Sequence, residues 1–311
     1  MRWIVDDLGV DPFLRTALSA SFSGHLEILQ WIYTGDPGGF IENSNEIFEE
    51  ASGHLHILQW ILTLPGINIT NATKNKSFKL AAFDGHLDTL RWLLTQGAEA
   101  SIDAFREALK GGQLDTAKWI LELLEGYIPD DMDFAKANSL KTLKWLAGFP
   151  GINPAANNNI AFIKAVRYGR LKRLKWLIQF PGVNPSTLNS VSIKNAAKYG
   201  HLDVLKWLMT FEDVNPIRQD NFALRIARKQ YDKLRNETRR NAYREIIRIL
   251  EHEAVIADKI NNDDVDDKKL CMLIKEFSFP GMLIYSYLEN AHSLYLQNLF
   301  EEKIRSHTSR C

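Results

Sequence analysis

The sequence is poor in cysteine and has no long apolar stretch. Its 311 residues include two cysteines, which are too few for a disulfide framework, so we expect a reducing compartment and a cytoplasmic location. A membrane-spanning helix needs about 18 or more apolar residues, and the most apolar stretch here is interrupted by Lys275, Glu276 and Pro280. The first residues lack the basic start and apolar core of a signal peptide. These absences favour a globular protein without a membrane span.

The net charge of the whole chain is zero, but its segments carry net charges of opposite sign. The 38 Lys/Arg residues balance 38 Asp/Glu residues. Residues 1–160 carry 12 basic and 20 acidic residues, a net charge of −8, whereas residues 161–250 carry 19 and 7, a net charge of +12. Residues 251–311 carry 7 and 11, a net charge of −4. Such segregation concerns partners rather than fold, and it predicts an acidic partner for the basic segment.

What the sequence does contain is a repeated string, of which "GHLDVLKWLM" (200–209) is one copy. Seven of the eight tryptophans occupy the same position in successive copies, 26 to 32 residues apart. Periods of this length are typical of stacked helical repeats. The seven are Trp31, Trp60, Trp92, Trp119, Trp145, Trp176 and Trp207.

Each copy predicts two helices. An apolar segment with a pair of alanines, such as Ala196–Ala197, precedes a glycine whose backbone can end the first helix. The second helix carries an apolar stripe and stops at a Pro/Gly string such as "FPGVNP" (180–185). We interpret the tryptophan as a core residue, because it recurs in this stripe. So short a pair cannot bury its apolar face alone, which predicts that the pairs stack into one continuous core.

These units resemble ankyrin repeats over about residues 11–255. The "GHLxxLxWLL" second-helix strings and the loops ending in "GIN", "GVN" or "DVN" carry the resemblance. It implies an all-α, ankyrin-type helical-repeat solenoid of about eight units at 1–255. Residues 256–311 would then be a C-terminal helical cap or a small separate helical extension. The tryptophan-containing variant is similar to ankyrin proteins of amoebae, large DNA viruses and bacteria that infect amoebae, which adds the hypothesis of an effector in a host cytosol.

The sequence departs from the ankyrin pattern in three places. The Thr-Pro-Leu-His string of that family is absent, so its bracing between repeats must be replaced or missing, and we expect less regular stacking. The fifth unit (133–145) is short and lacks the Gly-His pair. The eighth (222–250) contains an insertion of helical composition that bears Arg235, Arg239, Arg240 and Arg244.

No string predicts catalysis, a metal site or a cofactor. The repeated histidines should lie along a ridge of the stack rather than converge on a metal. Cys271 and His292 could be considered a nucleophile pair, but no neighbouring string suggests an orienting acid or an oxyanion hole. An enzyme housed in residues 256–311 is the rival hypothesis, and a cap explains this short segment more simply. The histidines in question are His25, His54, His86 and His201.

The best functional signal lies just before the turn glycines. In ankyrin stacks the two residues before each turn glycine face the concave groove. Here these positions place arginine or lysine beside aromatic residues, a combination that protein-binding hot spots favour. We therefore predict a non-catalytic scaffold that binds another protein through this face. The alternatives are a merely solvated cationic face, or a polyanion binder of nucleic acid or phosphoinositides that uses the basic segment 161–250. The predicted partner-binding residues are Phe83, Arg167, Tyr168, Lys198, Tyr199, Arg228 and Lys229.

Overall fold

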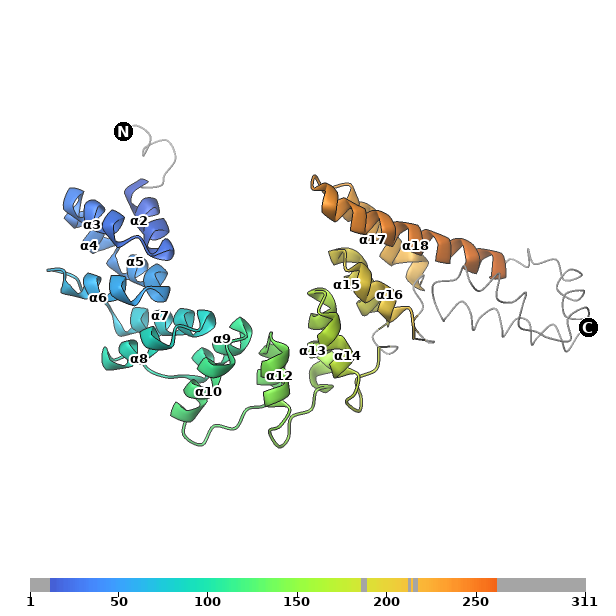
Figure 1. Ribbon diagram of the computed structural model, residues 1–311, viewed down its shortest axis with the longest axis horizontal. Coiled ribbons are helices and arrows are strands. Elements are labelled where there is room, and N and C mark those ends of the chain that lie inside the picture. Colours follow the sequence, from blue (N-terminus) through green and yellow to red (C-terminus); the bar gives the residue numbers. More distant parts are fainter. Residues whose placement is uncertain (1–11, 186–188, 212–213, 215–217, 262–311) are drawn as a thin grey trace, which may run out of the picture. The chain divides into compact units, whose positions relative to one another are not determined.

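The computed structural model describes residues 12–185, 189–211, 214 and 218–261, and all regular structure in this part of the chain is helical (Figure 1). The prediction of an all-α protein is therefore confirmed for these residues. The chain divides into two compact units, Met1–Asn153 and Pro154–Cys311, which we call the N-terminal body and the C-terminal body.

In the N-terminal body the helices form five successive pairs within the described residues. The first three pairs are α2 (Pro12–Ser23) with α3 (Leu26–Gly35), α5 (Ser44–Glu50) with α6 (Leu55–Thr63), and α7 (Asn71–Asp84) with α8 (Leu87–Thr95). The last two are α9 (Ile102–Gly111) with α10 (Leu114–Leu123), and α11 (Asp131–Lys136) with α12 (Leu140–Leu146). The short α4 (Pro37–Glu42) and the 3-10 turn η1 (Ala51–Gly53) lie on either side of α5.

The described part of the C-terminal body holds three further pairs. They are α13 (Ala156–Arg167) with α14 (Leu171–Leu177), α15 (Asn189–Tyr199) with α16 (Leu202–Leu208), and α17 (Arg218–Tyr231) with α18 (Glu237–Asn261). The expected insertion in the eighth unit lengthens this last pair, and α18 carries Arg239, Arg240 and Arg244. The helix also runs through the expected boundary at 255. The predicted cap at 256–311 otherwise lies outside the described residues, from 262 onward.

The first helices of successive pairs pack directly on one another. Within the N-terminal body α2 contacts α5, α5 contacts α7 and α7 contacts α9 (Figure 1). The helix α9 also contacts α11. Within the C-terminal body α13 contacts α15, which contacts α17. Small side chains permit this approach: Ala81–Ala82 and Ala196–Ala197 are fully buried. A large apolar residue three positions earlier, Phe78 in α7, is also fully buried, and its ring centroid lies 6.4 Å from that of Trp119 in the next pair. The predicted role of the alanine pairs is confirmed.

The tryptophans are not buried as predicted. The stripe of each second helix buries the leucines beside the tryptophan, such as Leu143 and Leu146, whereas Trp145 is half-buried and Trp31 is 68% exposed. The position of the tryptophan around the helix axis explains its exposure. Successive helical residues are about 100° apart, so the residue before Leu146 lies at the edge of the stripe.

From that edge the tryptophan reaches the neighbouring pair. Trp145 packs edge-on against Phe105 of the preceding pair, with ring centroids 6.3 Å apart, and against Phe149 of its own loop. Trp207 also reaches the preceding pair, where its ring lies tilted against that of Phe162, with centroids 6.4 Å apart. The tryptophan therefore links helix pairs and does not fill the centre of one.

The turn glycines form a second link between pairs. Gly24 has a positive φ of 81°, and a Cβ built on it would lie 2.6 Å from the ring of His54, which belongs to the next pair. His54 also donates from Nε2 to the Phe22 carbonyl oxygen, at 3.1 Å. The ring thus covers the glycine and holds the backbone two residues before it. We call this arrangement the glycine clamp.

The glycine clamp recurs with different side chains. His201 covers Gly169, where a Cβ would lie 2.5 Å from the ring, and donates to the Arg167 carbonyl oxygen at 2.8 Å. Where histidine is missing, another side chain takes its place. These contacts link each helix pair to the next one. The other covered glycines are Gly53 under His86, Gly85 under Gln113, Gly112 under Ser139 and Gly200 under Tyr243.

Candidate functional site

Four of the predicted partner-binding residues lie together at the ends of two first helices of the C-terminal body. Arg167 and Tyr168 stand at the end of α13, and Lys198 and Tyr199 end α15. Tyr168 is 54% exposed, Arg167 is exposed, and the other two are half-buried. The structure therefore brings together residues that are about one repeat apart in the sequence. We call these four residues the basic–aromatic row.

Cations and rings interleave in the basic–aromatic row. The Arg167 guanidinium carbon lies 5.4 Å from the centroid of the Tyr199 ring and 6.0 Å from that of Tyr168. Lys198 Nζ lies 5.2 Å from the Tyr199 centroid. Contacts of this length are cation–π interactions, which hold the charged groups against the rings. Two positive charges from successive helix pairs thus share one tyrosine ring.

The backbone beneath this row is held by the glycine clamp. His201 binds the Arg167 carbonyl oxygen, and Tyr243 Oη donates to the Lys198 carbonyl oxygen at 2.6 Å. The Tyr199 and His201 rings also stack, with centroids 6.4 Å apart. Sequence reasoning assigned His201 only to a ridge and missed Tyr243. The recurrence of the Gly-His pair could have indicated the role of His201. Tyr243 lies in the lengthened last pair, which cannot be aligned with the other copies.

The remaining predicted residues have other surroundings. Arg228 donates from Nε and Nη2 to Glu251 Oε1, at 3.2 and 2.6 Å, so its charge is offset by α18. Lys229 is exposed on the last turn of α17. Phe83 is 43% exposed at the end of α7, in the N-terminal body. No contact described here joins these three residues to the basic–aromatic row.

Ion pairing separates two kinds of cation in the C-terminal body. Arg240 and Arg244 both pair with Glu237, at 3.7 and 3.0 Å, and Arg248 pairs with Glu245 at 2.8 Å. Among the residues that the structure describes, neither Arg167 nor Lys198 forms an ion pair with a carboxylate. The basic character of 161–250 is therefore partly neutralised on α18 and retained at the row.

A buried arginine adds to the positive charge of this body. Arg173 occupies a position of α14 that Val204 fills in α16, and it is only 3% exposed. Burial, assisted by the neighbouring charge of Arg170, lowers the pKa of Arg173 to about 10. The guanidinium therefore still carries its proton at neutral pH.

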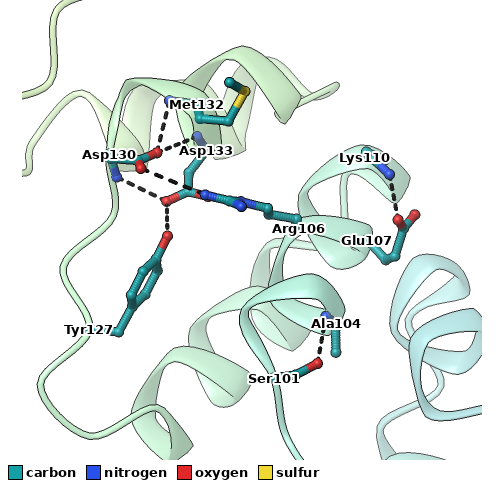
Figure 2. Close-up of polar contacts among 9 residues, drawn as sticks. All are labelled: Ser101, Ala104, Arg106, Glu107, Lys110, Tyr127, Asp130, Met132 and Asp133. Carbon is teal, nitrogen blue, oxygen red and sulfur yellow. Dashed lines mark hydrogen bonds and ion pairs between the residues drawn. The ribbon is translucent and has the colours of Figure 1, made fainter. Parts of the chain in front are cut away.

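The N-terminal body contains a polar cluster that resembles an active site in composition (Figure 2). Asp133 is completely buried and accepts hydrogen bonds from Arg106 Nε at 2.7 Å, Tyr127 Oη at 2.5 Å and the Asp130 backbone N–H at 2.9 Å. Asp130 in turn accepts from the backbone of Met132 and Asp133, which completes a capping box at the start of α11.

The electrostatics of this cluster indicate a structural role. Burial raises the pKa of Tyr127, and its hydrogen bond to Asp133 raises it further. The bond to Asp133 also raises the pKa of Arg106. Tyr127 and Arg106 are thereby held in the protonated forms that these bonds require, and Asp133 accepts from three donors. The cluster joins α9 to the short α11, and so supports the fifth pair, in which Ser139 stands in place of the clamp histidine.

Other candidate sites give no positive case. Within the described ranges, no group of three or more His, Cys, Asp and Glu side chains is arranged to hold a metal ion. None of the helices described has both the length and the apolar content needed to cross a membrane. Cys271 and His292, considered above as a nucleophile pair, lie outside the described residues. No protein-family model matches this chain, and no curated protein matches it.

Proposed function

We propose that this chain is a non-catalytic, ankyrin-type repeat protein that binds another protein through the basic–aromatic row. The observation that carries the proposal is the placement of Arg167 and Lys198 on one tyrosine ring, without a described carboxylate partner. Repeat proteins commonly bind through the concave surface that their stacked units form, and we assign the row to such a surface.

The chemistry of the row suits a protein interface. Tyrosine and arginine dominate binding hot spots, because a flat ring buries much area at little entropic cost and a guanidinium donates several hydrogen bonds. Tyr168 leaves more than half of its surface accessible. The fixed carbonyl groups of Arg167 and Lys198 hold the backbone in place before a partner arrives, which reduces the ordering cost of binding.

The test is a comparison of bound proteins between matched variants. Proteins captured from native cytosol are quantified for the wild type, for the double variant Tyr168→Ala with Tyr199→Ala, and for Tyr231→Ala. Tyr231 is the control, because its ring also contacts an arginine, Arg240 at 4.7 Å, in the same body but outside the row.

The double variant should weaken binding of a specific partner by about 2 kcal/mol, or roughly thirtyfold, as loss of hot-spot side chains does. The Tyr231 variant should retain it, and circular dichroism should show all three proteins folded. A partner that remains bound to the double variant with unchanged affinity would contradict the proposal.

A further inference from the structure

The basic–aromatic row has a feature that narrows the chemistry of its partner. Arg167 and Lys198 lie 5.4 and 5.2 Å from the centroid of the same Tyr199 ring, so their charged groups are at most roughly 11 Å apart. Like charges at this separation repel each other, and an anion placed between them is attracted by both. We infer that the row binds an acidic peptide segment, with one carboxylate held between Arg167 and Lys198. This inference rests on the proposed function.

The surroundings of the two cations favour a carboxylate from outside. Every arginine of α18 with a described ion pair is matched by a glutamate of the same helix, Glu237 or Glu245. At the row, the described residues supply rings and backbone groups around the cations and no carboxylate in contact. A charge-assisted hydrogen bond to an incoming carboxylate would therefore not have to displace an internal one.

On α18 the same pattern disfavours the binding of nucleic acid. A nucleic-acid backbone presents regularly spaced phosphates, and binding it requires several cations along a continuous track. Beyond the row, the arginines of α18 are interspersed with Glu237, Glu245 and Glu251, and Arg228 is held by the last of these. These glutamates interrupt any continuous track of cations along α18, which disfavours a chain of phosphates on that helix.

Tyr168 indicates what should stand beside the carboxylate. Its ring is 54% exposed, lies within 6.0 Å of the Arg167 guanidinium, and follows that residue directly in the chain. A ring exposed next to a cation offers an apolar surface at the edge of the charged site. We therefore expect an aromatic or aliphatic side chain next to the bound acidic residue.

The experiment uses the full chain and a short fluorescein-labelled peptide of alternating glutamate and phenylalanine, followed by fluorescence anisotropy. Two altered peptides carry glutamine for glutamate or glycine for phenylalanine, and a single-stranded oligonucleotide of equal charge serves as the nucleic-acid probe. The protein variants are Arg167→Gln, Lys198→Gln, Tyr168→Ala and, as the control for net charge, Arg248→Gln. Arg248 is exposed in the same body and is paired with Glu245.

We expect Arg167→Gln or Lys198→Gln to weaken peptide binding at least tenfold, and Arg248→Gln to change it by less than twofold. The glutamine peptide should bind the wild-type protein at least tenfold more weakly than the unaltered peptide does. The glycine peptide should bind the wild-type protein several-fold more weakly than the unaltered peptide, whereas Tyr168→Ala should bind these two peptides equally. Equal losses for all three charge variants, or equally tight binding of the oligonucleotide, would overturn the inference.

A failure of the inference can be told apart from a failure of the proposed function. If the acidic peptide does not bind while Tyr168→Ala with Tyr199→Ala still removes a specific cellular partner, the row is an interface for a partner of different chemistry, and only the inference is wrong. If neither the peptide nor any partner depends on the row, both are wrong. Circular dichroism of each variant distinguishes these results from unfolding.

Discussion

Replacing Gly24 by alanine adds one methyl group at a place where the next helix pair leaves no room for it. The new Cβ would lie 2.6 Å from His54 Cε1 and 2.7 Å from His54 Nδ1. The φ of 81° is also one that residues with a side chain rarely adopt. Two separate costs therefore arise, and the chain offers a control for each of them.

The backbone cost alone is about 1–2 kcal/mol for a left-handed residue that is not glycine. The steric cost is additional, because the His54 ring must move and so loses its bond to the Phe22 carbonyl oxygen, worth about 0.5–1.5 kcal/mol. We expect Gly24→Ala to lower the free energy of unfolding by about 2–3 kcal/mol. Gly126→Ala should cost only the backbone part, about 1–2 kcal/mol, because its φ is 75° and nothing lies within 4 Å of its Cβ position.

Urea unfolding followed by far-ultraviolet circular dichroism measures these differences from the midpoints and slopes. The double variant Gly24→Ala with His54→Ala removes the ring that the methyl group strikes, so its loss should be smaller than the sum of the two single losses. Equal destabilisation by Gly24→Ala and Gly126→Ala, or strict additivity in the double variant, would refute the glycine clamp as an energetic link.

Two further predictions concern the polar cluster. Asp133→Asn leaves Arg106 without its main carboxylate and should lower the free energy of unfolding by about 3 kcal/mol. Asp103→Asn, which removes an exposed carboxylate 3.8 Å from Lys79, should cost less than about 1 kcal/mol in the same urea assay. Because the raised pKa of Tyr127 stabilises the fold fully below its ordinary value of about 10 and less as pH rises above it, Tyr127→Phe should flatten the alkaline decrease in stability. An unchanged alkaline slope in this variant would contradict that assignment.

The helix pairs could be predicted from the sequence, because an apolar period and a turn glycine are local signals. The burial of each tryptophan could not. Recurrence shows that Trp145 holds the same position in its copy as its counterparts do, but whether it lies at the centre or edge of the stripe depends on an angle of about 100° between residues. Its contact with Phe105 also depends on how closely the preceding pair approaches, which no single copy of the string contains.

The candidate site could be predicted in part for a similar reason. Tyr168 and Tyr199 share a register, so their proximity follows from stacking. The pairing of Arg228 with Glu251 and the bond from Tyr243 to Lys198 join residues far apart in the chain, outside the regular repeat. These contacts arise from the lengthened last pair. The repeat period of the sequence cannot predict contacts of residues that lie outside that period.

In the glycine clamp each helix pair depends on the pair that follows it in the sequence. In every instance described, the covering side chain comes later in the sequence than its glycine, as His54 does for Gly24 and Tyr243 for Gly200. During synthesis, which proceeds from the N-terminus, each completed pair therefore waits uncovered until the following pair has been made. A truncation that removes α18 would uncover Gly200 and free the Lys198 carbonyl, whereas a truncation that removes α2 would leave that part of the chain intact. The first and last described helices are thus not equivalent in what their loss would do to the basic–aromatic row.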